Sequence, residues 1–120
     1  MKMRLVMHVA AMLVCASSAN AEMSFAGAGA NPCSLLNANV SPDPSKNPTA
    51  MLIFTWVEGF LSGMNGMAFN LPPGKAVFDL NAIPSQMQWD HLVAYCRADP
   101  SALIPTAAID LAVKRLKNAN

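Results

Sequence analysis

Residues 56–69, WVEGFLSGMNGMAF, decide the fold: they are apolar enough for a membrane span, yet they carry Glu58 and three glycines. At 100° per residue, one narrow side of a helix over residues 49–68 is polar. Its members are Thr55, Glu58, Ser62 and Asn65. A continuous polar stripe does not suit lipid, and a carboxylate near the middle of a span would cost about 3 kcal/mol. We therefore predict a globular helix over 49–68, buried on most of its circumference, and no membrane span in the mature chain.

The three glycines of this helix fall on one side, in a groove lined by Leu52, Trp56, Gly59, Gly63 and Gly66. Each glycine costs about 1 kcal/mol relative to alanine inside a helix. A Gly-xxx-Gly spacing lets a partner backbone approach closely. Two interpretations follow: another helix of the same chain crosses here, or a second subunit binds here. The candidate interface and client-binding residues are Trp56, Gly59, Phe60, Gly63, Met64 and Met67.

Three further segments have helical patterns, and none has the alternation typical of a strand. A short turn begins at Cys33 and is followed by a proline-rich loop. A helix starts near Ser85, with Gln88 as its capping-box partner, and stops before Pro100. The last helix covers 101–117, and Pro105 either kinks its first turn or resets its start. The prediction is an all-α fold: a small, bundle-like domain of four to five helices over residues 33–117, followed by a C-terminal tail at 118–120.

The N-terminal residues have the pattern of a secretory signal peptide over 1–21. Lys2 and Arg4 precede an apolar run over 5–15, which is too short for a stable span of about 20 residues. Small residues at Ala19 and Ala21 place cleavage before Glu22. The alternative, a lipoprotein signal at Cys15, is opposed by the bulky valine before it. We expect a periplasmic protein whose residues 22–32, rich in alanine and glycine, form a flexible N-terminus.

Two cysteines remain after cleavage, Cys33 and Cys96. In an exported chain, an even count indicates a disulfide, and two cysteines permit one pairing. The bond would close a loop of about 63 residues and stabilise the fold by about 4 kcal/mol on the chain-entropy model. The alternative is a pair of free thiols.

Charge and reactive groups exclude several functions. The mature chain has six Lys and Arg against seven Asp and Glu, a formal net charge of −1, so it has no basic patch for nucleic acid. His91 adjoins Asp90, but neighbours on a helix point apart, so a surface histidine is expected. Ser62 lies one residue too far along the chain to be the serine of a G-x-S-x-G motif. Metal-ligand spacing is absent from the sequence. We expect no catalytic residues, no metal, no cofactor and no enzyme activity.

The order of motifs resembles a known family. A cysteine begins a short helix, W-x-x-G-F-L-S-G follows at 56–63, D-x-x-x-x-P at 79–84, and W-x-x-L-x-x-Y-C-R-x-x-P at 89–100. This set is similar to the small one-disulfide helical periplasmic proteins of the HdeA/HdeB type. The resemblance covers residues 33–117. It implies a disulfide-tied helical fold that is dimeric near neutral pH and an acid-activated chaperone, or holdase, for unfolding client polypeptides.

A second family is also similar: the immunity proteins that inhibit type VI secretion amidase effectors, which share the aromatic-x-x-Gly helix. That resemblance implies tight binding to one cognate effector. In either case the partner is another polypeptide, and a homodimer is an open possibility. Glu58 is the candidate pH-sensitive residue, because burial at an interface would favour its neutral form.

Overall fold

The computed structural model describes residues 26–117; the predicted signal peptide, the cleavage site before Glu22 and the tail at 118–120 lie outside them. Four α-helices form in the described part: α1 (Cys33–Ala38), α2 (Pro48–Asn70), α3 (Ser85–Ala98) and α4 (Ile104–Leu111). Two 3-10 turns, η1 (Ala28–Ala30) and η2 (Pro44–Lys46), precede α2, and a π-helical turn, η3 (Ala112–Leu116), continues α4. Residues 26–117 form no strand, so the predicted all-α fold is confirmed.

The start of α2 is fixed by local chemistry. The side-chain oxygen of Asn47 accepts hydrogen bonds from the backbone N–H groups of Thr49 (2.9 Å) and Ala50 (3.0 Å). Pro48 occupies the first turn, where its missing N–H costs nothing. The helix ends at Asn70, shortly before two prolines that cannot continue it. Helix α2 therefore begins one residue before the predicted start at 49 and ends two residues after the predicted end at 68.

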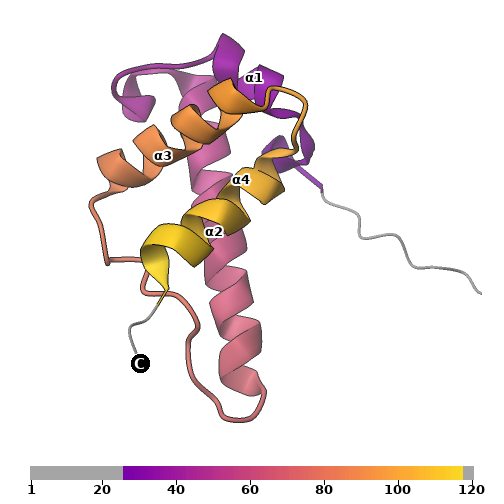
Figure 1. Cartoon of the computed structure of the whole chain (residues 1–120), viewed down its shortest axis with the longest axis vertical. Coiled ribbons are helices and arrows are strands. Elements are labelled where there is room, and N and C mark those ends of the chain that lie inside the picture. The colour runs from indigo at the N-terminus through magenta and orange to yellow at the C-terminus, as the bar shows by residue number, and fades with distance from the viewer. Residues whose placement is uncertain (1–25, 118–120) are drawn as a thin grey trace, which may run out of the picture.

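Helix α2 runs along the long axis of the molecule, and α3 and α4 lie across its N-terminal part (Figure 1). The C-terminal end of α2 projects beyond them. Contact with α3 includes an edge-on pair of rings, Phe54 and Trp89, whose centroids are 6.0 Å apart. The core is formed mainly by fully buried side chains of α2, α3 and α4. They include Ile53, Val57, Leu61, Trp89, Leu92, Ile104 and Leu111.

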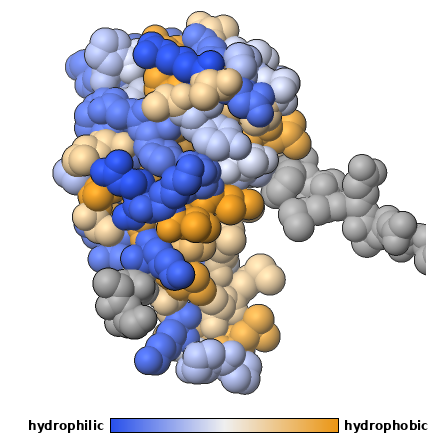
Figure 2. Space-filling view, viewed as in Figure 1, coloured by the Kyte–Doolittle hydropathy of each residue, from blue (hydrophilic) through white to orange (hydrophobic). Residues whose placement is uncertain are grey.

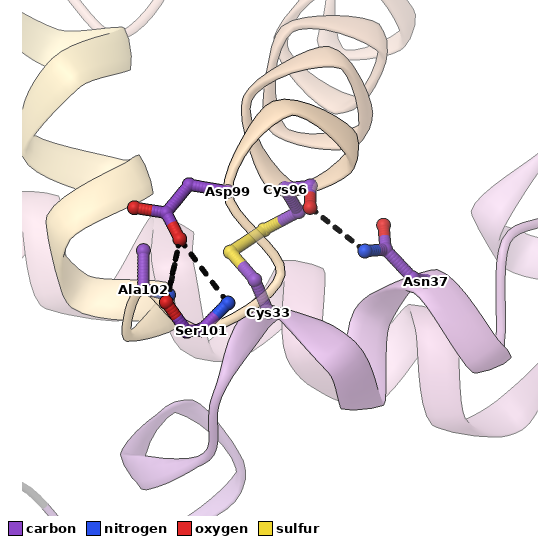
Figure 3. The surroundings of a disulfide bond; sticks show 6 residues. All are labelled: Cys33, Asn37, Cys96, Asp99, Ser101 and Ala102. Atoms are coloured by element: carbon purple, nitrogen blue, oxygen red, sulfur yellow. Dashed lines mark hydrogen bonds between the residues drawn. A yellow bond between two sulfur atoms is a disulfide. The ribbon is translucent and has the colours of Figure 1, made fainter.

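A disulfide joins α1 to α3, as predicted: Cys33 and Cys96 are bonded, with Cα atoms 4.9 Å apart. Both cysteines are fully buried. Beside the bond, the Asn37 amide donates to the Cys96 carbonyl at 2.7 Å (Figure 3). In the same region, Asp99 accepts hydrogen bonds from the hydroxyl and backbone N–H of Ser101. The disulfide and these polar contacts together fix the junction of α1, α3 and the turn before α4.

The long loop between α2 and α3 is held by side-chain amides. Asn65 accepts from the backbone N–H groups of Val77 (3.1 Å) and Phe78 (2.9 Å), and donates to the Phe78 carbonyl (2.8 Å). Gln88 is buried and donates to the carbonyls of Leu80 (2.9 Å) and Ile83 (3.1 Å). The prediction that Gln88 is a capping-box residue is therefore wrong, because its side-chain amide donates hydrogen bonds to loop carbonyls instead.

Two boundaries differ from expectation. Helix α4 starts at Ile104 rather than 101, with Pro105 in its first turn, so the proline resets the start. Within the N-terminal segment expected to be flexible, Ala28–Ala30 forms a 3-10 turn and Gly29 is buried. Ordered packing therefore begins before Cys33.

Candidate functional site

The outward side of α2 carries exposed apolar residues and three glycines. We call it the glycine face and define it as Leu52, Gly59, Gly63, Gly66 and Met67, all of which are exposed. A Cβ atom placed on any of the three glycines would meet nothing within 4 Å. The expectation that another helix of the same chain crosses here is therefore wrong. The expected burial of α2 on most of its circumference is also wrong, since about half of its residues are exposed. A subunit or partner interface stays a prediction.

This exposed side is apolar and nearly uncharged. Leu52 is 60% exposed, Met67 70% and Phe69 65%. Glu58 is the one charged residue among the 23 residues of α2, and it is exposed. Nothing within the described chain buries Glu58, so its expected pH-sensitive role would require a partner to cover it. Figure 2 shows hydrophilic side chains gathered over α3 and the end of α4, and both hydrophobic and hydrophilic side chains at the projecting end of α2.

Near the C-terminal end of α2 the glycine face widens into a shallow open groove of about 380 Å³. It is lined by Gly66, Met67, Asn70 and Leu71. The lining contains no charged side chain and no titratable group. A groove of this kind suits an apolar side chain from another macromolecule rather than a polar small molecule.

Along one border of the glycine face stand two aromatic rings, Trp56 and Phe60, which we call the aromatic ledge. The rings are stacked, with centroids 5.1 Å apart and planes 11° from parallel. Both side chains are partly buried against the core. The indole N–H of Trp56 donates to the carbonyl of Ala26 at 2.9 Å. The N-terminal segment therefore lies against this ring.

The predicted interface residues divide into two groups. Gly59, Gly63 and Met67 are exposed on the glycine face. Trp56, Phe60 and Met64 are partly buried against the hydrophobic core. All six come from one helix, so the structure places them on adjoining strips of a single surface.

A polar cluster that the sequence did not reveal joins α3 to α4. His91 Nε2 lies 2.8 Å from Asp110 Oδ2, and Lys114 Nζ lies 2.7 Å from Asp110 Oδ1. Asp110 and Lys114 have the i, i+4 spacing of neighbours on one helix face. His91 was expected to be a surface residue and is instead paired. Helical periodicity indicates the side of each helix on which His91 and Asp110 lie. The contact could have been predicted only by assuming that these two sides face each other.

Opposing effects act on the Asp110 carboxyl. Burial raises its pKa, but hydrogen bonds from Lys114 and His91, with their charges, outweigh burial and hold the pKa below its usual range. A carboxyl group whose pKa is lower in the folded state than in the unfolded state stabilises the fold at neutral pH. This stabilisation is lost in acid. Met87, Asp90 and Arg115 also surround His91 in a surface hollow.

Within 26–117, no three His, Cys, Asp and Glu side chains gather in a way that could hold a metal ion. A search of the same residues for a helix with the length and hydropathy of a membrane span finds none. Comparison of the chain with protein-family models, curated proteins and solved structures gives no match.

Proposed function

We propose that this protein binds other polypeptides in the periplasm through the glycine face, as a holdase of the HdeA/HdeB type that protects clients in acid. One observation carries the proposal: a 23-residue helix has an outward side with exposed apolar residues, three uncovered glycines and a single charge. The buried disulfide is consistent with an oxidising compartment such as the periplasm. Within residues 26–117, no other helix has a comparable exposed side.

The chemistry of this surface suits a protein partner. Without Cβ atoms at Gly59, Gly63 and Gly66, a bound chain can bring its backbone close to α2. Met67 beside them is unbranched and polarisable, so it can adapt to different apolar partners. Exposed apolar surface of this kind commonly marks a site of protein interaction. A varied set of partially unfolded clients matches these properties.

Acid would increase the area available to clients. With every carboxylate protonated, the mature chain would carry six Lys and Arg charges together with His91, and self-repulsion of that size loosens a small domain. Protonation of Asp110 would also weaken the contact between α3 and α4. The Cys33–Cys96 bond would keep the loosened chain compact.

A second function is favoured by a different aspect of the same surface. The glycine face is already exposed in the folded chain, so acid is not needed to uncover it. A preformed surface suits one dedicated partner at neutral pH, as in an immunity protein bound to its effector. The two functions differ in pH dependence and in the number of partners.

The test is suppression of client aggregation at pH 2–3 and at pH 7, with light scattering on the same samples. The informative variant is Gly63→Lys, which places a charge in the middle of the glycine face where a side chain meets nothing in the monomer. The matched control is Ala98→Lys, which adds the same charge at an exposed position of α3. We expect suppression in acid, abolished by Gly63→Lys and retained by Ala98→Lys. Absence of suppression at both pH values, with nanomolar binding to one effector at pH 7, would establish the second function instead.

A further inference from the structure

The N-terminal segment forms a strap over α2. We define the strap as residues 26–31, AGAGAN, which include the η1 turn. One side of the Trp56 ring stacks on Phe60, and the strap backbone lies against the same indole. The indole N–H is hydrogen-bonded to the Ala26 carbonyl at 2.9 Å. The strap therefore occupies the aromatic ledge in the way that a bound peptide would.

Glycine is required where the strap meets the ring. A Cβ atom on Gly29 would lie 1.9 Å from Trp56 Cε3 and 2.1 Å from Cδ2, which is far inside contact distance. The ring cannot retreat freely, because it is already stacked on Phe60. Gly27 has a φ of 83°, a conformation that other residues rarely adopt, and its own Cβ would be 3.3 Å from the ring. The ledge thus selects a backbone turn built from small residues.

Hydrogen bonds hold the strap at both of its ends, to Trp56 and to Ile104. At its C-terminal end, the Asn31 carbonyl accepts a hydrogen bond from the Ile104 N–H at 3.1 Å. Its own turn is closed by Ala30 N–H to the Gly27 carbonyl (3.1 Å) and by the Asn31 amide to the Ala28 carbonyl (2.9 Å). Ala26, Gly27 and Ala30 remain exposed. Since three of its six residues are exposed, the strap should open at a lower free-energy cost than the core.

We propose that the aromatic ledge is a binding site for a glycine- and alanine-rich polypeptide segment that forms a turn there, and that the strap is its resident, exchangeable occupant. This inference rests on the proposed function and names the partner segment it favours. The partner supplies a backbone carbonyl to the Trp56 indole N–H and glycine where the peptide crosses the ring. Displacement of the strap adds the ledge to the neighbouring glycine face and enlarges the surface that a client contacts.

The experiment uses the purified mature protein and a synthetic peptide of residues 26–31. The indole N–H resonance of Trp56, assigned with Trp56→Phe, reports occupancy of the ledge; Trp89 is buried and serves as an internal reference. Gly29→Ala should expel the strap, and Ala30→Ser, at the exposed next position, is the matched control. A second peptide carrying Gly29→Ala tests the requirement for glycine. Gly27→Val provides an independent way to expel the strap, and circular dichroism verifies the helices of each variant.

In Gly29→Ala we expect the Trp56 resonance to move and its indole proton to exchange faster, because the bond to Ala26 is lost. The 26–31 peptide should return the resonance toward its original position. Half-saturation should need at least about threefold less peptide than for the wild-type chain, in which the strap competes at high effective concentration. Ala30→Ser should behave as wild type, and the peptide with Gly29→Ala should not bind.

An unmoved Trp56 resonance in folded Gly29→Ala and Gly27→Val would overturn the proposal, as would equal binding of the two peptides. The outcome is separable from that of the aggregation assay. Peptide binding at the ledge without client protection would refute the proposed function alone. Client protection that is unchanged in folded Gly29→Ala, with no peptide binding, would refute the strap alone.

Discussion

Replacing Gly63 by alanine tests whether the glycine face is uncovered in the monomer. A Cβ atom at this position meets nothing within 4 Å, so the substitution introduces no clash. Alanine is favoured over glycine in a helix interior by about 1 kcal/mol. The monomer should therefore become more stable by about 1 kcal/mol, and for a domain of this size that raises Tm by about 4–8 °C. Gly59→Ala should act in the same direction, since its surroundings are equally open.

If a second subunit packed against the glycine face, Gly63→Ala would destabilise the protein instead of stabilising it. In an assembly where a second backbone lies against Gly63, the added methyl group overpacks the interface and costs about 1–3 kcal/mol. The assay is urea unfolding followed by far-UV circular dichroism at low and high protein concentration, with light scattering to give the mass. Ala94→Gly, at an exposed position within α3, calibrates the propensity effect and should lower stability by about 1 kcal/mol. Destabilisation by Gly63→Ala at the low, monomeric concentration would refute the reasoning.

Three further predictions concern stability. Replacing Cys33 and Cys96 by alanine should lower the free energy of unfolding by about 4 kcal/mol, measured by urea unfolding; an unchanged midpoint would contradict the role of the disulfide. Asn65→Ala removes three hydrogen bonds to the loop and should cost about 1–3 kcal/mol, with faster hydrogen exchange of the Phe78 amide; unchanged exchange would argue against this tether. The Asp110 pKa is depressed from 3.8, so its contribution to stability is present above that unfolded value and is lost as pH falls through the folded value. Asp110→Asn should therefore be less stable at pH 6 and show a weaker acid dependence than wild type; parallel stability curves would count against the cluster.

The two proposed functions place different demands on this stability. A holdase has to loosen in acid, so the depressed pKa of Asp110 and the growing positive charge act in its favour. A dedicated inhibitor requires a fixed surface at neutral pH, which the disulfide and the Asn65 contacts help to maintain. The pH at which the glycine face binds is consequently the measurement that separates them.

Local chemistry in the sequence was sufficient for much of the fold. Asn47 followed by Pro48 is a helix start whose hydrogen bonds involve the next few residues alone, so the cap could be predicted without tertiary contacts. Two cysteines in the predicted mature chain allow one pairing, so the disulfide also followed from counting. The all-α class followed from helical spacing in each segment.

Tertiary structure alone decided which side of α2 faces outward. The helix is apolar around most of its circumference, so periodicity gave a weak signal, and the glycines fitted an internal crossing as well as an open face. Packing determines the orientation of α2, because Ile53, Val57 and Leu61 are buried in the core. Gly59 and Gly63 lie on the opposite side of the helix and are exposed.

The remaining features of the site depend on pairs of residues far apart in the chain. His91 meets Asp110 because α3 packs on α4, and Gly29 meets Trp56 because the N-terminal segment returns across α2. A sequence states the chemistry of each side chain and the preferences of its neighbours. It does not state which distant residue each side chain will contact in the fold of lowest free energy. Those contacts form both the acid-sensitive cluster and the strap.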